Sequence, residues 1–448
     1  MDEIALRALL ERAVEEEPPM GLLVSESLHA GKKLARRRRI EAAIAAVAAV
    51  ALLAVVVPAA FGALRPGSRS RPVAGGPAPA TAFVWTTANA VTPIRLSDGK
   101  ALRGVHVPGN ISAIAVAPDG TAAFVFSYTS RRSGLGRVIV GNFVTRIDGA
   151  TGNAGRPVRT TVDVQQAVIA PGGTRADAMA YWARGRGYGF GLVAINLATG
   201  AVHVVLTDTS VAVLWEDPLV AQGNYAYTIA GNRVVAVNLA TGKIRARIAI
   251  PHTPSFLTVM SGSQTVYVTS SFTQAREATP VWLTPVNFAT GKAGTSIKVL
   301  ERAAYSGDDE VAIAPDGRTA YVYGGKTVVP VDLSTGKTLP SIDVAVGNNF
   351  PSFSSAPGST TAYVTWNTKW LQPISVATST ADRELVMPGG YTQAAPLAFS
   401  PDGGVAYVPA ALHGGNAVDA VIPLNTSTQQ FGAPTMVRGR PLQVVVIP

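Results

Sequence analysis

The sequence contains no cysteine among its 448 residues. Without a thiol, the chain cannot form a disulfide, a thiolate metal site or a cysteine nucleophile. Charged residues make up only 15% of the chain, while apolar residues make up 47%, a content too high for a disordered protein. The histidines are few, and their spacing fits no metal motif: His29, His106, His203, His252 and His413. We therefore expect a large folded core, no metal and no cofactor.

Sequence motifs of nucleophilic catalysis and of phosphate or nucleic-acid binding are missing as well. The chain has no GxSxG nucleophile elbow. The stretch 184–191 (RGRGYGFG) has alternating glycines, but it does not join a strand to a helix as a phosphate-binding loop does. No nucleic-acid-binding fold motif occurs. The sequence therefore favours a binding module over an enzyme and speaks against nucleic acid as a partner; a catalytic site assembled from distant segments stays open.

The sequence is rich in tight turns and in short apolar strands, with 44 glycines and 31 prolines. From residue 82 to residue 448 one four-part unit recurs, and residues 311–346 show it most clearly. Its parts are an apolar run up to Pro315-Asp316-Gly317, a Tyr-Val strand at 319–323, a strand at 328–333 that ends in a Thr-Gly turn, and an outer strand at 341–346. Val, Ile, Tyr and Thr suit a pleated, half-buried surface, and glycine supplies the positive φ of tight turns.

The Thr-Gly turn counts the repeats. Its intact and degenerate copies lie at Asp98-Gly99, Thr151-Gly152, Thr199-Gly200, Thr241-Gly242, Thr290-Gly291, Thr335-Gly336, Thr378-Ser379 and Thr426-Ser427. Eight repeats with four strands each, between residues 82 and 448, predict an all-β protein, an eight-bladed β-propeller. Seven blades are the alternative, if the degenerate stretch 176–219 is not a blade.

The two ends of the repeat region complement each other. Residues 81–85 form a Tyr-Val-type strand that lacks the apolar run before it, and residues 442–448 form an apolar run that lacks the strand after it. Since a single repeat cannot bury both faces of its small sheet, the units must stack in a ring. We therefore expect the C-terminal strand to pair into the first blade and to close the ring.

Two strands contain a four-residue motif, Tyr267-Val268-Thr269-Ser270 and Tyr363-Val364-Thr365-Trp366, and residues 237–243 (VNLATGK) contain the turn that goes with it. In these motifs the units resemble the YVTN-repeat family of β-propellers, which are similar to WD-repeat proteins. The resemblance implies the propeller fold for most of the chain. It implies no particular activity, because propellers host many functions.

An apolar segment precedes the repeats. Residues 42–64 carry no charge and would span about 34 Å as a helix, enough for a hydrocarbon core. Six basic residues at 32–39 precede it and fewer follow, so the positive-inside rule places the N-terminus in the cytoplasm. A cleaved signal peptide is the alternative. The expected parts are a helical cytosolic tail (1–39), one transmembrane helix (40–64), a Pro/Gly/Ala-rich linker (65–80) and the propeller (81–448).

The long insertions between predicted strands all belong to one face of the propeller: 127–142, 183–191, 270–280, 300–309 and 412–416. We expect the same face to carry a basic sector, because from Arg131 to Arg186 the sequence has nine arginines (131, 132, 137, 146, 156, 159, 175, 184 and 186) against three aspartates, which would attract acidic polymers or headgroups. The densest acidic cluster of the repeat region is 308–310, which is either a cation site or a solvated turn. The candidate ligand-binding residues are Arg131, Arg132, Arg184, Arg186, Asp308 and Asp309.

The anchor favours a single-pass protein of the cytoplasmic membrane, whose extracytoplasmic propeller binds a protein or an acidic envelope ligand as a sensor or scaffold. The tail resembles short cytosolic tails of actinobacterial membrane proteins, some of them anti-sigma factors, which implies signalling through the tail as one alternative. Another is an exported enzyme of dehydrogenase or lactonase type. The quinone-dependent dehydrogenases typically have a Trp soon after the Thr-Gly turn, and residues 243–247 have none. A cell-envelope scaffold similar to the outer-membrane assembly propellers is a further alternative.

Overall fold

The structure, a computed structural model, describes residues 81–447 with gaps. The gaps are 134–135, 185–186, 208–218, 260–262, 271–279, 302–310, 315, 324–326, 345–351, 357–358, 366–368 and 413–418. The expected tail (1–39), transmembrane helix (40–64) and linker (65–80) lie outside the described residues. Within the part that is described, no helix has the length and apolar character needed to cross a membrane.

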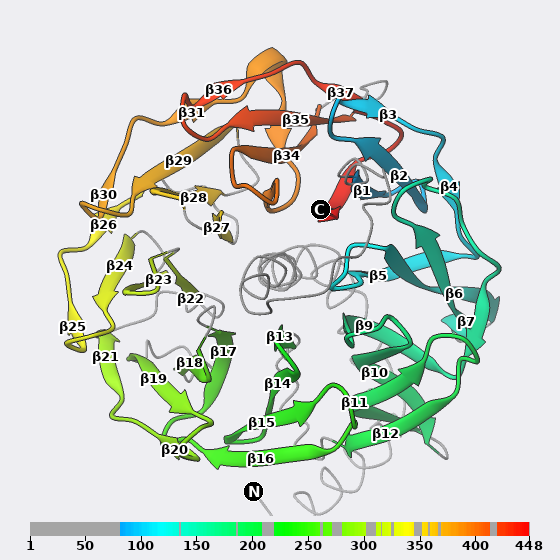
Figure 1. Ribbon diagram of the computed structural model, residues 1–448, viewed down its shortest axis with the longest axis horizontal. Helices are drawn as coiled ribbons and strands as arrows, with labels where there is room; N and C mark the ends of the chain where they lie inside the picture. Colours follow the sequence, from blue (N-terminus) through cyan, green and yellow to red (C-terminus); the bar gives the residue numbers. More distant parts are fainter. Residues whose placement is uncertain are drawn as a thin grey trace, which may run out of the picture. The chain divides into compact units, whose positions relative to one another are not determined.

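Eight antiparallel sheets stand around a common centre, and each is a blade (Figure 1). From centre to rim, blade 1 consists of β38 (Pro441–Ile447), β1 (Thr81–Thr86), β2 (Ala90–Arg95) and the pair β3 (Lys100–Ala101) and β4 (Val105–His106); blade 2 consists of β5 (Asn110–Val116), β6 (Ala122–Ser133), β7 (Gly136–Asp148) and β8 (Val158–Thr160). Blade 3 consists of β9 (Val162–Ile169), β10 (Arg175–Arg184), β11 (Gly187–Asn196) and β12 (Val202–Thr207). Blade 4 consists of β13 (Val220–Gln222), β14 (Tyr225–Ala230), β15 (Arg233–Asn238) and β16 (Ile244–Ala249).

In the other four blades, as in the first, the fourth strand is in two pieces. Blade 5 consists of β17 (Pro254–Val259), β18 (Thr265–Ser270), β19 (Val281–Asn287), β20 (Lys292–Ala293) and β21 (Ile297–Leu300); blade 6 consists of β22 (Val311–Ile313), β23 (Thr319–Tyr323), β24 (Thr327–Asp332), β25 (Lys337–Thr338) and β26 (Ile342–Asp343). Blade 7 consists of β27 (Ser352–Ser355), β28 (Thr361–Thr365), β29 (Trp370–Ser375), β30 (Thr380–Ala381) and β31 (Leu385–Val386). Blade 8 consists of β32 (Thr392–Gln393) and β33 (Ala398–Phe399), β34 (Val405–Ala411), β35 (Asp419–Asn425), β36 (Gln430–Phe431) and β37 (Thr435–Val437). A 3-10 turn, Pro388–Gly390, precedes β32.

The C-terminal strand closes the ring, as the sequence predicted. Strand β38 pairs antiparallel with β1, from Thr81↔Ile447 onward, and its register shifts before Thr86. Strands β9 to β12 form a complete blade, so the degenerate stretch is a true repeat and the count is eight rather than seven. The eight-bladed, all-β propeller is therefore confirmed.

The core of the ring lies between the blades. Eight buried apolar clusters occur, one at each interface between neighbouring blades. The cluster of blades 2 and 3, for example, joins Phe126 of β6 to Val164 of β9 and Ala178 of β10. This arrangement follows from the alternation along each strand, because successive side chains point toward opposite neighbouring blades.

One position in the second strand of each blade is central to these interfaces. The third residue of that strand is a buried aromatic in seven blades: Phe83, Phe124, Tyr227, Tyr267, Tyr321, Tyr363 and Tyr407. These rings reach the next blade, as in the contact of Tyr321 with Phe353, whose ring centroids are 4.9 Å apart. The Tyr363 hydroxyl also donates to the Thr426 carbonyl oxygen of the next blade at 3.5 Å. We call this third residue the aromatic position. In blade 3 it is Asp177.

A proline accompanies most of the broken outer strands. In five blades the residue paired with the aromatic position is proline: Pro93, Pro285, Pro330, Pro373 and Pro423. Because proline has no N–H to donate, the fourth strand cannot pair continuously past it. In all five blades the fourth strand is split at this point, whereas β12 and β16, on strands with Ala194 and Ala236 at the same place, are single strands. Blade 2 has Arg146 at this place, and its outer segment is also broken, into the bridge Ile147↔Ala154 and β8.

The turn after the third strand has one geometry around the ring. Its first residue is usually Asp or Asn, and the side chain of Asn238, for instance, accepts from the backbone N–H groups of Ala240 at 3.0 Å and Thr241 at 2.9 Å. The fifth residue of the turn has positive φ in every blade: Gly99, Gly152, Gly200, Gly242, Gly291, Gly336, Ser379 and Gln429. The eighth copy of the Thr-Gly turn is therefore Thr428-Gln429, and its prediction at Thr426-Ser427 was wrong by two residues.

The antiparallel topology gives the ring two faces. The connections between first and second strands and between third and fourth strands lie on one face, which we call the turn face. The connections between second and third strands and between successive blades lie on the opposite face, which we call the loop face. The sequence-based assignment of the long insertions to a single face agrees with this topology.

Candidate functional site

Among the described residues, two neighbouring blades have the longest second and third strands, which extend toward the loop face. Strands β6 and β7 contain 12 and 13 residues, and β10 and β11 contain 10 each. The second strands of the other blades contain five to seven. The predicted insertions 127–142 and 183–191 are therefore not irregular loops, since the hairpin pairing continues to Ser133↔Gly136 and to Arg184↔Gly187. Together these hairpin ends, residues 129–133, 136–141, 181–184 and 187–190, form what we call the long-hairpin surface.

The end of the β6–β7 hairpin carries exposed apolar and basic residues. Ile139 is 39% exposed and Val140 is 46% exposed. The register shifts between Thr129 and Ser130, so that Val140 is an extra residue in β7. Arg131 is exposed on β6. A bulge of this kind twists the hairpin end and redirects its side chains.

Aromatic packing holds the second hairpin against the ring. A Cβ atom on Gly189 would lie 2.5 Å from Cε2 of Trp182, so the indole requires glycine at this place. Trp182 packs against the core cluster between blades 2 and 3. On the other side of the hairpin the rings of Tyr181 and Phe190 lie 4.5 Å apart. Gly189, one of the alternating glycines of 184–191, thus serves ring packing.

The structure describes only part of the predicted site. Arg131 lies exposed on β6, and Arg132 and Arg184 lie near the ends of β6 and β10, where the side chains are outside the described atoms. The hairpin register pairs Arg132 with Arg137. The remaining predicted residues, Arg186, Asp308 and Asp309, lie outside the described residues, so their role stays a prediction.

The predicted basic sector is divided between the two faces. Arg146 lies two residues before the end of β7, 3.6 Å from Asp148 of the following turn, and Arg156 comes soon after that turn. Arg175 begins β10 directly after a turn of the first-to-second type. All three therefore belong to the turn face, and their assignment to the loop-face sector was wrong. The sequence count failed because residues at opposite ends of one strand lie on opposite faces.

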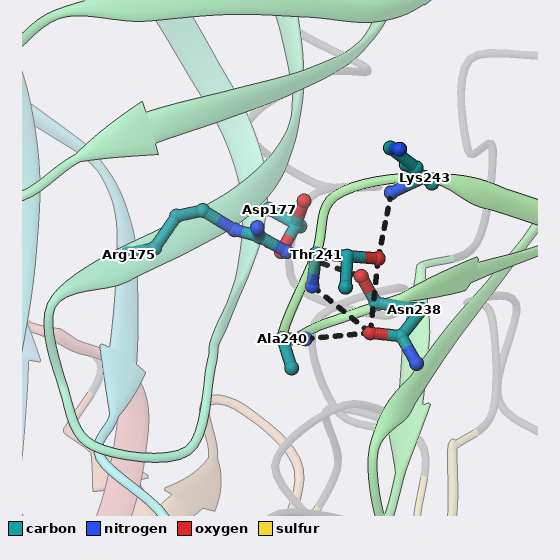
Figure 2. A network of polar contacts seen from close by, with 6 residues as sticks. All are labelled: Arg175, Asp177, Asn238, Ala240, Thr241 and Lys243. Atoms are coloured by element: carbon teal, nitrogen blue, oxygen red, sulfur yellow. Dashed lines mark hydrogen bonds and ion pairs between the residues drawn. The ribbon is translucent and has the colours of Figure 1, made fainter.

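Arg175 and Asp177 form an ion pair at the joint between blades 3 and 4. The Asp177 side chain is completely buried, and its Oδ2 accepts from Nη2 of Arg175 at 2.9 Å and from Nε at 3.2 Å. The same Nη2 donates to the Asn238 carbonyl oxygen of blade 4 at 3.2 Å. Figure 2 shows the guanidinium between Asp177 and the turn that Asn238, Ala240 and Thr241 form. The hydrogen bond from Arg175 thus reaches the turn of the next blade, as the hydrogen bond from the Tyr363 hydroxyl does in blade 7.

Burial raises the pKa of Asp177 to about 6, although the nearby Arg175 guanidinium acts in the opposite direction. The other oxygen, Oδ1, has no hydrogen-bond partner among the described atoms. We did not recognise this pair from the sequence, where Asp177 was only one acid among many arginines. A signal was present, since alignment of the repeats places Asp177 where the other seven blades have Phe or Tyr.

Within the described residues, no group of three or more His, Asp or Glu side chains could hold a metal ion. The described part of the long-hairpin surface presents the exposed Arg131, the exposed apolar residues Ile139 and Val140, and hairpin backbone. Groups of this kind can recognise carboxylates and extended peptides.

Comparisons with known proteins show similarity of fold. No protein-family model and no curated protein matches the chain. A solved structure of dihydro-heme d1 dehydrogenase NirN in complex with DHE matches with a TM-score of 0.60 at 15% identity, covering 84% of this chain and 77% of that one. A eukaryotic initiation factor matches with a TM-score of 0.51 at 10% identity, covering 82% and 98%. BamB from Moraxella catarrhalis has a TM-score of 0.49 at 14% identity, covering 73% and 88%.

These identities support the propeller fold and nothing finer. One of the matched structures is a dehydrogenase and another is an initiation factor, so the shared fold does not select an activity. The function must be argued from the surfaces of this chain.

Proposed function

We propose that this chain is a single-pass membrane protein whose extracytoplasmic propeller, built of YVTN-type repeats, binds an acidic partner through the long-hairpin surface and performs no catalysis. One observation carries the proposal. The two hairpins that extend on the loop face belong to neighbouring blades, and residues 129–142 and 183–191 contain five arginines and no acid. The partner is an acidic protein segment or an acidic polymer of the cell envelope.

The physical argument rests on charge and rigidity. Arginine presents a planar fork of donors that matches a carboxylate, and its charge persists at any physiological pH. Hairpins anchored in a closed ring hold these groups in place, which lowers the entropy lost on binding. Because Arg131 is exposed, its attraction to an acidic partner is expected to weaken as ionic strength rises.

Binding of polyglutamate by the full chain tests the location of the site. The loop-face variant replaces Arg131, Arg132 and Arg137 by alanine, and we expect it to bind about tenfold more weakly than the unchanged chain. The matched control replaces Arg146, Arg156 and Arg318 by alanine, which removes the same charge from the turn face. Equal losses in the two variants would show that binding follows net charge alone and would refute the site.

The membrane topology is supported by the apolar segment 42–64 and by the basic residues before it. Protease treatment of intact cells, with epitope tags at residues 1 and 448, tests it independently of binding. We expect loss of the C-terminal tag alone, with the remaining fragment bound to the membrane. A C-terminal tag that is protected until the cells are lysed would place the propeller in the cytoplasm and contradict the proposal.

A further inference from the structure

The β6–β7 hairpin has an unpaired strand edge on the loop face. On its rim side, β7 pairs with β8 only from Asn142↔Thr160 to Val144↔Val158. The chain then leaves β8 at Thr160 and begins β9 in the next blade. Among the described residues, 136–141 of β7 therefore have a hairpin partner on one side and no strand on the other. This edge is about 20 Å long at the rise of an extended chain.

A side chain shows in which direction the edge points. Arg159, exposed on β8, donates from Nη2 to the Val140 carbonyl oxygen at 3.3 Å. Val140 lies in β7 just beyond the last residue that pairs with β8, so its carbonyl is directed to the place where an extension of β8 would run. The Arg159 guanidinium occupies the hydrogen-bond position of a missing strand, and an exposed side chain can leave it at small cost.

The residues around this edge select a partner by charge. Proteins usually protect an exposed edge with charged residues, because an open edge recruits other strands. Here the charges are all positive: Arg131, Arg132 and Arg137 lie on the hairpin, with no acid between residues 129 and 142. The arginines repel a basic strand and form no ion pair with a neutral one, whereas an acidic strand gains ion pairs with them. Exposed Ile139 and Val140 add apolar contact for alternate side chains.

We infer that residues 136–141 of β7 receive an extended acidic segment of a partner protein as an added strand, in line with β8. The inference rests on the proposed function and specifies how the partner binds. Main-chain hydrogen bonds to the edge supply affinity, and arginine–carboxylate pairs supply selectivity. An acidic envelope polymer without a peptide backbone is not expected to bind in this way.

Two peptides with the same charge test the inference on the full chain. The first is a blocked alternating Glu-Val octapeptide, and the second is its analogue with an N-methyl group on every amide, which has no N–H to donate to a strand edge. We expect the analogue to bind at least about tenfold more weakly, and the unmodified peptide to slow hydrogen exchange of the amides at 136–141. Equal binding of the two peptides, together with binding of polyglutamate, would overturn strand addition and leave the proposed function intact. If neither peptide nor polyglutamate binds, the proposed function itself fails.

A pair of single variants gives a second readout. Arg159→Ala and Arg131→Ala remove the same charge, but only the first frees the Val140 carbonyl. Strand addition predicts that Arg159→Ala binds the Glu-Val peptide at least as tightly as the unchanged chain, whereas Arg131→Ala binds it a few-fold more weakly. An Arg159→Ala variant that loses as much affinity as Arg131→Ala would show that Arg159 contributes as a simple charge and would contradict the inference.

Discussion

The turn face and the loop face are ends of the same strands, and they differ in how much they vary from blade to blade. On the turn face, the residue with positive φ recurs in all eight third-strand turns, even where it is Ser379 or Gln429. On the loop face, the hairpin between second and third strands ranges from a two-residue turn, Gly231-Asn232 in blade 4, to the long hairpin of blade 2. One end of each strand is therefore constrained and the other is free to change.

The constraint comes from contact between blades. A Cβ atom on Gly200 would lie 1.9 Å from the Arg159 carbonyl oxygen of the preceding blade, and one on Gly152 would lie 2.9 Å from Pro93. The Arg175 guanidinium and the Tyr363 hydroxyl both reach a turn of the following blade. Changes on the turn face are thus expected to alter stability, while changes at the long-hairpin surface are expected to alter binding.

Removal of a ring from the aromatic position has the largest expected effect. Tyr363 is fully buried and contacts Phe399 of the next blade. Tyr363→Ala should lower the free energy of unfolding by about 3–5 kcal/mol, measured by urea denaturation. Trp370→Ala is the control, since Trp370 is 37% exposed at the loop-face end of β29, and it should cost less than about 1 kcal/mol. Similar losses in both variants would contradict the special role of the aromatic position.

Two glycines at the same place in the repeat separate steric contact from backbone strain. Gly200→Ala should cost about 2–4 kcal/mol, because both the positive φ and the contact with the Arg159 carbonyl oppose a Cβ. Gly291 has the same φ, but its Cβ would meet nothing within 4 Å, so Gly291→Ala should cost only about 1–2 kcal/mol. Thermal denaturation of the two variants measures the difference. Equal midpoints would mean that contact between blades does not constrain the turn.

The joint between blades 3 and 4 makes the stability depend on pH. The folded pKa of Asp177, about 6, lies above the ordinary value of 3.8, so folding favours the protonated form. The stabilisation is complete below the ordinary value and is lost as pH rises through 6, by an amount on the order of 3 kcal/mol. Asp177→Asn should therefore gain stability relative to the unchanged chain as pH increases over this window. Parallel denaturation curves for the two proteins across the window would exclude a perturbed Asp177.

The smallest effect on stability is expected at the long-hairpin surface. Arg131→Ala should change the free energy of unfolding by less than about 0.5 kcal/mol, because Arg131 is exposed. It should nevertheless weaken polyglutamate binding a few-fold, through the loss of one charge. Arg146→Ala should change neither quantity measurably. Titration calorimetry and denaturation on the same samples test the two variants. A binding defect in Arg146→Ala would place the site on the turn face and contradict the account.

The fold could be predicted because each repeat is defined by residues that lie close together in the sequence. The turn residues and the Tyr-Val strand recur in order, and the unmatched ends of the repeat region predicted the pairing of β38 with β1. In five blades the splitting of the fourth strand also has a local contribution, since Pro285 and its equivalents lack the N–H that a continuous strand requires. These features depend on neighbouring residues and can be inferred from sequence alone.

The site was less accessible to sequence reasoning because it depends on positions along strands. Residues 129–133 have no apolar alternation, so the extension of β6 was expected to be a loop. Arg146 and Arg131 lie in paired strands of one hairpin, and only the register shows that they belong to opposite faces. The replacement of an aromatic ring by the Arg175–Asp177 pair could be recognised only after the second strands of all eight blades had been aligned with one another.

Shortening one hairpin tests the central claim most directly. Residues 130–140 of the full chain would be replaced by Asn-Gly, which suits a two-residue hairpin turn between Thr129 and Gly141. The account predicts that the thermal midpoint changes by no more than about 2–4 °C, and that binding of polyglutamate and of the Glu-Val peptide falls at least about tenfold. Undiminished binding by a folded variant would show that the site lies elsewhere. A large loss of stability would show that this hairpin belongs to the framework of the ring.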